Sequence, residues 1–262
     1  MTLPLEGRRA IVCGSTQGIG RACAERLAAD GSHVTLLARS PEALAEVRDA
    51  LPVPAKQRHA WIAGDFNSWE DTARSVSEFL EDRGEVDILV NNTGGPPPGT
   101  ALDANPADYL DAMKPHLALS QAIVQAVVPG MKKTKHGRII NVISTSVLMP
   151  IRGLGVSNAV RGAMGNWSRT LADELAADGI TVNNVLPGFT ETGRLKAIFE
   201  RKAQKAGTTP EKIRQQIVNA IPARRIGQPE ELAALVAFLA SDMAGYINGV
   251  SIPVDGGRLA AL

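Results

Sequence analysis

Short runs of β-branched and other apolar residues alternate along this chain with longer amphipathic segments. Seven runs are expected to be strands: 10–12, 34–37, 62–63, 88–90, 139–143, 181–186 and 251–254. The segments between them repeat their apolar residues with helical spacing, as in 18–29, 41–51, 69–80, 117–128, 159–176 and 230–239. Strands separated by helices cannot pair as hairpins, so they form a parallel sheet covered by helices on both faces. The sequence therefore predicts an α/β protein with a doubly wound, mostly parallel sheet of about seven strands.

The chain of 262 residues contains no internal repeat and no low-complexity linker. We therefore expect one domain over residues 1–262. Hydrophobic residues make up 44% of the chain and charged residues 21%, which suits a globular protein with a full core. The polar, helical segment 190–222, interrupted at 207–210, is expected to be a lid or substrate loop. A rigid surface insertion is the alternative.

The charge balance limits the partners that the chain can attract. Its 28 basic and 27 acidic residues leave a net charge of +1, so no bulk field draws in nucleic acid or an anionic membrane. Two cysteines, Cys13 and Cys23, do not make a disulfide framework. Residues 1–7 lack the features of a signal peptide, and no apolar stretch is long enough to span a bilayer. We expect a soluble cytoplasmic protein with a small-molecule substrate and no metal site.

A glycine-rich turn follows the first expected strand and leads into a helix. Glycines at such a turn let the backbone approach a pyrophosphate, which lies against the free N–H groups at the helix N-terminus. The turn consists of Gly14, Ser15, Thr16, Gln17, Gly18, Ile19 and Gly20. It predicts a dinucleotide-binding site.

The G-x-x-x-G-x-G spacing of this turn resembles that of the short-chain dehydrogenase/reductase family, and in particular its 3-oxoacyl-ACP reductases. Further matches are the segments 91–94 (Asn-Asn-Thr-Gly), 187–188 (Pro-Gly) and 255–257 (Asp-Gly-Gly), in the family's order along nearly the whole chain. The resemblance implies a nicotinamide dinucleotide as cofactor and oxidoreductase chemistry.

The resemblance also implies roles for residues beyond the turn. Asp65, with Phe66 beside it, would receive the adenine, and Asn91 would brace the central strand and line the cofactor. Ile19 would pack near the nicotinamide, and Thr190 and Thr192 would hold its carboxamide side. Asp65 capping a turn and the two threonines capping the next helix are the alternatives. The expected cofactor site also includes Thr93, Gly94, Pro187 and Gly188.

The choice between NAD and NADP depends on the end of the second expected strand. An acidic side chain there would bind the ribose diol of NAD. Ala38, Arg39 and Ser40 occupy this position, and Arg39 offers a charged fork for a 2′-phosphate. We therefore expect NADP(H), with NAD less favoured. A solvated surface arginine is the alternative.

The catalytic residues differ from those of the family that the chain resembles. That family carries a serine after the fifth strand, a tyrosine thirteen residues later, a lysine four further on and an asparagine on the preceding helix. In this register the four positions are Ser144, Ser157, Arg161 and His116. The tyrosine that moves a proton and the lysine that assists it are absent.

These substitutions change the chemistry at each position. A serine hydroxyl is a much weaker acid than a phenol, so Ser157 is a poor proton donor. Arg161 stays protonated, so it can bind ribose hydroxyls or an oxyanion but cannot relay a proton. His116 is either a substitute acid/base acting through water or a packed helix histidine. Ser144 is expected to donate a hydrogen bond to the substrate, with Thr145 or Ser146 as alternatives.

Three functions follow. The leading hypothesis is an NADP(H)-dependent oxidoreductase that reduces a carbonyl or oxidises an alcohol with an atypical site. The others are a catalytically silent dinucleotide-binding protein and a non-redox lyase or dehalogenase.

The resemblance also implies a homo-oligomer, most simply a tetramer that pairs last strands and long helices across two-fold axes. Ala163, Gly165 and Ala172 would permit close packing of such a helix.

Overall fold

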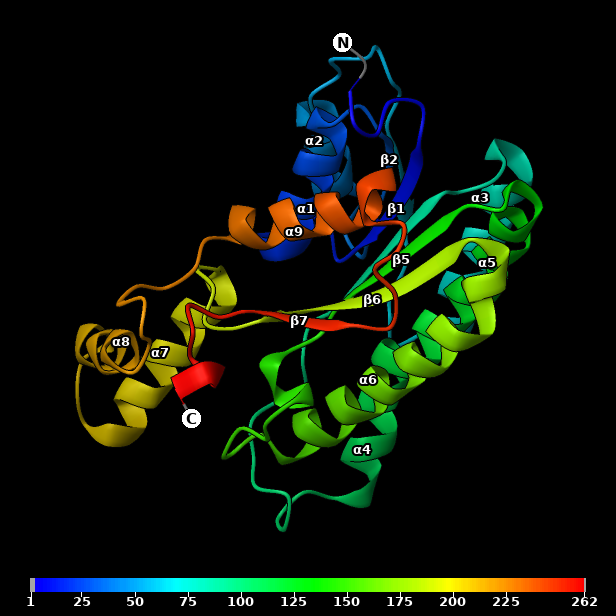
Figure 1. Ribbon diagram of the computed structural model, residues 1–262. Helices are drawn as coiled ribbons and strands as arrows, with labels where there is room; N and C mark the ends of the chain where they lie inside the picture. The colour runs from blue at the N-terminus through cyan, green and yellow to red at the C-terminus, as the bar shows by residue number, and fades with distance from the viewer. Residues whose placement is uncertain (1–2, 262) are drawn as a thin grey trace.

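A seven-stranded, entirely parallel sheet runs through the centre of the computed structural model, which describes residues 3–261. Residues 1, 2 and 262 of the expected domain lie outside this range. The strand order is β3-β2-β1-β4-β5-β6-β7, and each strand of the sequence analysis is present (Figure 1). The predicted doubly wound fold is confirmed. The strands are β1 (Arg9–Cys13), β2 (His33–Ala38), β3 (Ala60–Ala63), β4 (Ile88–Asn92), β5 (Gly137–Val142), β6 (Ile180–Pro187) and β7 (Ser251–Val254).

Helices cover both faces of the sheet, because successive side chains of each strand point to opposite sides. In β1, Ala10 and Val12 join the core under α1 (Gly18–Ala29), α2 (Pro41–Ala50) and α9 (Pro229–Ala240). Ile11 and Cys13 join the core under α3 (Trp69–Arg83), α5 (Leu119–Thr134) and α6 (Gly155–Leu175). Figure 1 shows these two groups of helices on either side of the strands.

Between β4 and α5 the chain forms two elements that the apolar periodicity did not predict. Helix α4 (Pro106–Met113) begins with a capping box between Asn105 and Asp108. A π-helical turn, Lys114–Ala118, follows and leads directly into α5. Pro115 has no N–H to donate, so one regular α-helical hydrogen bond cannot form there. The wider turn carries His116 into the interior, where it is 1% exposed.

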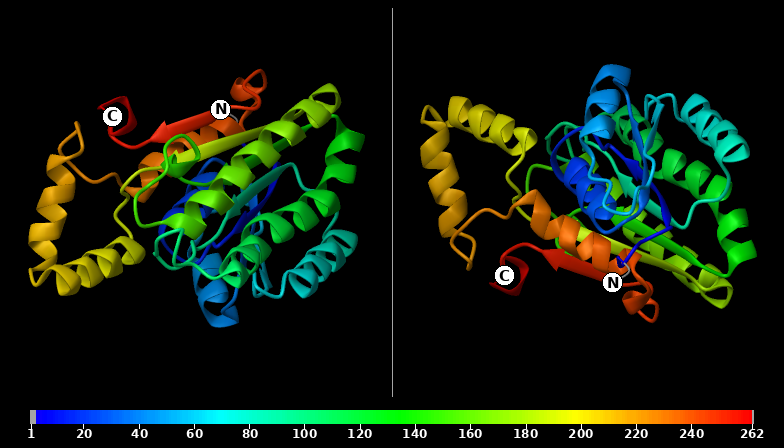
Figure 2. Two further views of the ribbon diagram at one scale, coloured as in Figure 1. Left: turned by 90° about the horizontal axis from the view of Figure 1, so that it is seen from below. Right: turned by 90° about the horizontal axis from the view of Figure 1, so that it is seen from above.

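Helices α7 (Gly193–Ala206) and α8 (Pro210–Asn219) form the segment expected to be a lid. They stand out from the body of the molecule on one side (Figure 2). Leu195, Phe199 and Ile213 belong to a small core of this pair, separate from the two main cores. The segment is therefore an ordered helical pair, and its movement as a lid stays a prediction.

A row of buried amides crosses the middle of the sheet. Asn91, Asn141 and Asn184 are register partners on β4, β5 and β6, and Ser251 of β7 completes the row. The amide of each asparagine donates to the next residue, over 2.9, 3.0 and 3.0 Å. Because buried polar groups need partners, this row fixes the register of the four strands β4, β5, β6 and β7.

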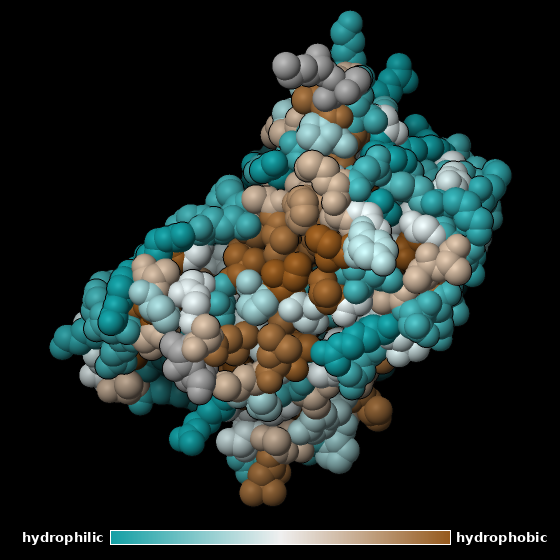
Figure 3. Space-filling view, in the orientation of Figure 1, coloured by the Kyte–Doolittle hydropathy of each residue, from teal (hydrophilic) through white to brown (hydrophobic). Residues whose placement is uncertain are grey.

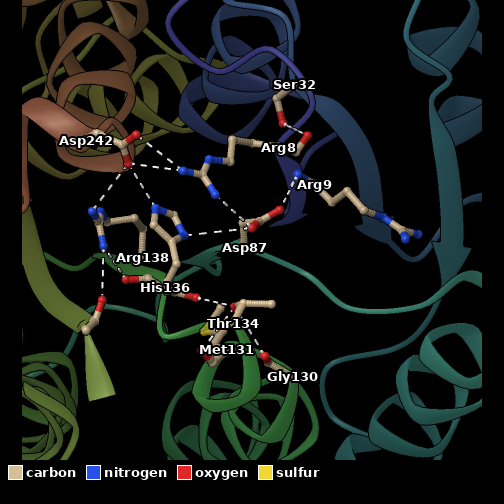
Figure 4. A network of polar contacts seen from close by, with 12 residues as sticks. Arg8, Arg9, Ser32, Asp87, Gly130, Met131, Thr134, His136, Arg138 and Asp242 are labelled. Carbon is tan, nitrogen blue, oxygen red and sulfur yellow. Dashed lines mark hydrogen bonds and ion pairs between the residues drawn. The ribbon is translucent and has the colours of Figure 1, made fainter. Parts of the chain in front are cut away.

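A network of ion pairs lies at the amino ends of β1, β4 and β5 (Figure 4). Arg8 lies 3.3 Å from Asp87 and 3.2 Å from Asp242, while buried Arg138 lies 3.6 Å from Asp242. His136 contacts both carboxylates. Buried Arg138 and half-buried Arg8 therefore both have a carboxylate partner, as such groups usually require.

Two of the small residues expected to face another subunit are buried within the chain instead. A β-carbon on Gly165 would lie 2.6 Å from Val147, and Ala172 is 2% exposed in the core under α6. These two residues therefore serve packing within the chain. Within residues 3–261, no helix is sufficiently long and apolar to cross a membrane.

Candidate cofactor and active site

The glycine-rich turn lies at the carboxyl end of β1, where ligands bind in sheets of this kind. Gly14 and Gly18 have left-handed φ values of 61° and 55°. A β-carbon on Gly20 would lie 2.1 Å from the carbonyl oxygen of Gly14. The Asn92 amide donates to the carbonyls of Cys13 and Gly14, over 3.2 and 3.3 Å, and ties the turn to β4. Each glycine is thus required by backbone conformation or close approach.

The N-terminus of α1 is free to bind an anion. Gln17 occupies the N-cap position without a capping side-chain hydrogen bond, and the first turn contains no acidic residue. Within residues 3–261 the N–H groups of this turn have no side-chain partner, and such groups favour negative charge. Ser15 is fully buried, and its Oγ has no hydrogen-bond partner within residues 3–261. Thr16 and Ile19 are partly exposed on the same turn. These residues fit a dinucleotide pyrophosphate.

Asp65 and Arg39 lie where the resemblance places the adenosine half of a cofactor. Asp65 Oδ1 accepts from the backbone and side chain of Asn67, so the turn-capping alternative is realised, while Oδ2 has no partner within residues 3–261. Arg39 is exposed and makes no hydrogen bond or ion pair within the same range. Ser40 caps α2 through Ala43 and donates to Glu42. Of these side chains, Arg39 is the one left free for a phosphate.

The segment after β6 closes over the glycine-rich turn. Thr192 caps α7 through the N–H of Leu195, the alternative weighed for it, and its methyl group lies 3.3 Å from the position of a β-carbon on Gly18. Thr190 is buried and donates to the carbonyl of Gly188. Gly188 packs against Asp255, with no room for a side chain. Thr192 thus lies beside the expected pyrophosphate position, and Pro187 is partly exposed at the end of β6.

Several predicted residues from distant parts of the chain line one small cavity. The cavity has a volume of about 20 Å³, and its lining includes His116, Arg161, Asn91, Thr93 and Phe66. That volume is sufficient for a water molecule. The structure therefore brings the predicted histidine and arginine together beside the strand that would line the cofactor.

Ser144 and Ser157 lie on separate elements, Ser144 directly after the lining residue Ile143 and Ser157 one helical turn before Arg161. The half-buried Ser144 Oγ accepts from the N–H of Ser146, and its own proton has no partner within residues 3–261. Ser157 lies in the first turn of α6, one turn before Arg161, and is 9% exposed. Thr145 and Ser146, the alternatives to Ser144, are buried. Ser144 is therefore the one of these three with access to a ligand.

Burial, together with the positive charges of Arg161 and Arg194, lowers the pKa of His116 to about 2. The imidazole is therefore neutral near pH 7. It cannot supply a proton as an imidazolium, but it can donate one hydrogen bond and accept another. No hydrogen bond of His116 to a backbone carbonyl occurs within residues 3–261. At the cavity wall, a neutral His116 is better suited to relay a proton than to store one as an imidazolium.

This low pKa has a consequence for stability. Between the unfolded value near 6.5 and the folded value near 2, the unfolded chain binds one proton more at this site, so stability falls as pH falls. Below about pH 6 this site should lower the free energy of unfolding of wild type by roughly 1.4 kcal/mol for each pH unit. We expect His116→Gln to lose this contribution. Urea unfolding of wild type and variant at pH 7 and pH 5 measures the difference. Equal slopes would contradict the assignment.

Arg194, near the start of α7, is a site residue that the sequence analysis missed. It lies in the segment expected to be a lid, far in sequence from the catalytic register. The structure places it beside Gly95 and close enough to lower the pKa of both His116 and Arg161. Its position two residues after Thr192 was the available signal.

Comparisons with known proteins agree with this architecture. A family model described as enoyl-(acyl carrier protein) reductase matches residues 14–258. The 3-oxoacyl-[acyl-carrier-protein] reductase FabG of Escherichia coli (strain K12) is 37% identical over 253 residues, covering 96% of this chain and 97% of that protein. NADPH-dependent reductase BacG of Bacillus subtilis (strain 168) is 32% identical over 269 residues, covering 97% of this chain and 99% of that protein.

Solved structures give the same result. The crystal structure of L-sorbose reductase from Gluconobacter frateurii, complexed with NADPH and L-sorbose, superposes with a TM-score of 0.92. The two sequences are 30% identical and the match covers 100% of each chain. The extent of these matches shows that this chain is a member of the short-chain dehydrogenase/reductase family of oxidoreductases.

Proposed function

We propose that this protein is an NADP(H)-dependent oxidoreductase that reduces a carbonyl group, or oxidises the corresponding alcohol, with an atypical active site. The observation that carries the proposal is the glycine-rich turn with an uncapped helix N-terminus, together with an exposed Arg39 that has no ion pair within residues 3–261. BacG is named as an NADPH-dependent reductase, and the L-sorbose reductase structure is a complex with NADPH. These two relatives support the choice of cofactor.

The chain's own residues would divide the work as follows. The glycine-rich turn and Arg39 would hold the cofactor, whose reduced nicotinamide would supply the hydride for the carbonyl carbon of the substrate. Ser144 would donate a hydrogen bond to the carbonyl oxygen, because its hydroxyl proton is free. Arg161 would stabilise the negative charge that develops on this oxygen, and a positive group preorganised in a buried site is effective in that role. Ser157 would add a hydrogen bond rather than a proton.

The proton for the new alcohol would come from water through the cavity beside His116. Neutral imidazole can accept from one water and donate to another group, so it can pass a proton without holding the charge. Arg161 lies on the same cavity and disfavours a charged imidazole. We therefore assign His116 as a relay for the catalytic proton.

Arg39→Ala tests the cofactor assignment. We expect wild type to bind NADPH more tightly than NADH, and the variant to lose roughly 10- to 100-fold in NADPH affinity, the range for one charge-assisted hydrogen-bonded group. NADH binding should change little. Calorimetric titration of both cofactors measures this. Arg152→Ala is a matched control, since Arg152 is also exposed and without an ion pair within residues 3–261. Equal affinity of wild type for both cofactors would refute the assignment.

A catalytically silent dinucleotide-binding protein is the second candidate. Two observations favour it: Ser157 occupies the position of the expected phenol, and the pKa of His116 is too low for a charged acid near neutral pH. Under this alternative, cofactor binding would remain and no turnover would occur. The deuterium-transfer measurement at the end of the Discussion separates the two.

We also propose that the protein is a homotetramer. Figure 3 shows apolar side chains gathered over α9 and β7, at the open edge of the sheet. Phe238 and Val250 are 39% and 37% exposed, and Met243 and Tyr246 between them are more exposed still. Contiguous apolar surface of this kind is typical of an interface between subunits. A second copy related by a two-fold axis would cover it and form a dimer, and pairing of two dimers through their long helices, as the family resemblance implies, would complete the tetramer.

We expect light scattering at micromolar concentration to give the mass of a tetramer. Phe238→Glu, which would bury a charge in the proposed contact, should shift the mass to a dimer or monomer. Glu78→Gln on the opposite side of the fold, where α3 lies, provides a control that also changes the net charge by one unit. A wild-type monomer would refute the proposal.

A further inference from the structure

Two arginines from different parts of the chain meet across Gly95, just beyond β4. A β-carbon on Gly95 would lie 2.6 Å from Nη2 of Arg194 and 3.2 Å from Nη2 of Arg161. The two nitrogens are therefore at most about 5.8 Å apart, the sum of those distances. Only glycine at this position leaves the space between the two guanidinium groups open.

Arg161 is buried and Arg194 is exposed near the start of α7, and neither has a carboxylate partner within residues 3–261. Arg161 is 7% exposed, its Nε is buried without a hydrogen-bond partner, and neither side chain forms an ion pair within residues 3–261. The nearest acidic residue in sequence, Glu191, is paired with Arg214 at 2.6 Å. Desolvation by burial, and then the charge of Arg194, lower the pKa of Arg161 to about 10, and no carboxylate opposes this shift.

This arrangement contrasts with the other end of the sheet. There, buried Arg138 and half-buried Arg8 share the carboxylate of Asp242 (Figure 4). A buried cation without a partner is costly, and a second cation beside it adds repulsion. A pair of this kind is expected where a ligand brings the missing negative charge.

The anion could come from the cofactor or from the substrate, and the structure favours the substrate. Donors for the cofactor phosphates already exist elsewhere, at the uncapped N-terminus of α1 and at Arg39. Arg161 instead lines the cavity with His116, at the reaction end of the site. Two planar guanidinium groups are well suited to the two oxygens of a carboxylate.

We infer that Arg161 and Arg194 bind a carboxylate of the substrate, so the substrate is a carbonyl compound that carries a carboxylate group near the reacting carbon. The inference rests on the proposed function for the reaction, but the binding itself does not require turnover. A 2-oxo acid is the simplest compound of this class.

The test compares benzoylformate with its neutral methyl ester, two compounds that share the ketone and ring and differ in the carboxylate. Binding is measured by calorimetry, with the protein alone and with NADP⁺ present. We expect the acid to bind about tenfold or more tightly than the ester, as for a charge-assisted pair of hydrogen bonds. Arg194→Gln and Arg161→Gln should each abolish this preference. Arg201→Gln, an exposed arginine on the same helix α7, should retain it.

NADPH titration of Arg194→Gln identifies the source of the anion. An NADPH affinity within about threefold of wild type, with the acid preference lost, supports the substrate site. A loss of NADPH affinity with the acid preference retained would assign the pair to the cofactor and overturn the inference. Equal binding of acid and ester by wild type, or no binding of the acid at millimolar concentration, would also overturn it. Failure of wild type to bind NADPH would refute the proposed function. The preference for acid over ester, measured with the protein alone, would still decide the inference about the two arginines.

Discussion

The double variant Ser157→Tyr, Arg161→Lys is expected to reduce neutral activated ketones with NADPH roughly 10²- to 10⁴-fold faster than wild type. The reason is that a phenol protonates a developing alkoxide far better than the serine hydroxyl, and a lysine beside it lowers the phenol pKa. Both positions lie on one face of α6, one turn apart, so the restored pair would act together. Initial rates of NADPH consumption with trifluoroacetophenone measure the effect.

The variant Ser157→Phe, Arg161→Lys is the matched control, because it adds the same ring without the hydroxyl. It should show no acceleration. An equal gain with phenylalanine would mean that the ring improves packing or substrate affinity rather than acid catalysis. Wild-type rates already as high as those of the tyrosine variant would show that the missing acid has been replaced by another group.

Gly20→Ala is expected to weaken NADPH binding by roughly 100-fold or more. Its new β-carbon would lie 2.1 Å from the Gly14 carbonyl oxygen and 2.7 Å from the Asn92 amide nitrogen, so the turn or the start of α1 must move. Displacement of about two charge-assisted hydrogen bonds to phosphate would account for such a loss. Overpacking should also reduce the free energy of unfolding by roughly 1–3 kcal/mol. Fluorescence titration and urea unfolding measure the two effects.

Gly162→Ala is the control for this substitution. Gly162 lies within α6, and its β-carbon would have no atom within 4 Å. Alanine should stabilise the helix there by roughly 0.5–1 kcal/mol and leave NADPH binding unchanged. Normal NADPH binding by Gly20→Ala would mean that the turn does not hold the pyrophosphate.

The sheet could be predicted from the sequence because its signals are local. Each buried parallel strand is a short apolar run, and the glycine-rich turn after β1 carries its own conformational requirement at Gly14 and Gly20. The start of α5 was less accessible. The apolar periodicity of 117–128 gives no sign of a break. Pro115, however, interrupts the α-helical hydrogen bonds just before α5, and the resulting π-helical turn buries His116.

The two-arginine arrangement could not be predicted in the same way. Arg161 followed from the register of the family that the chain resembles, whereas Arg194 lies in a polar helix whose exposed face resembles ordinary solvated surface. Only the path of the chain after β6 brings α7 back over Gly95. Contacts of this kind depend on tertiary structure, and the short distance in sequence between Arg194 and Thr192 is the one signal that the sequence offers for them. The uncapped N-terminus of α1, in contrast, was implied by the glycine spacing.

The measurement that tests the central claim most directly is deuterium transfer from NADPH deuterated at C4 of the nicotinamide. The protein is incubated in excess over NADPH labelled on either face, with benzoylformate, its methyl ester and trifluoroacetophenone in parallel, and the products are analysed by mass spectrometry. We predict that deuterium from one face of the cofactor appears on the former carbonyl carbon, and that transfer to benzoylformate exceeds transfer to its ester. Bound NADPH with no deuterium in any product would contradict the claim and identify a silent dinucleotide-binding protein.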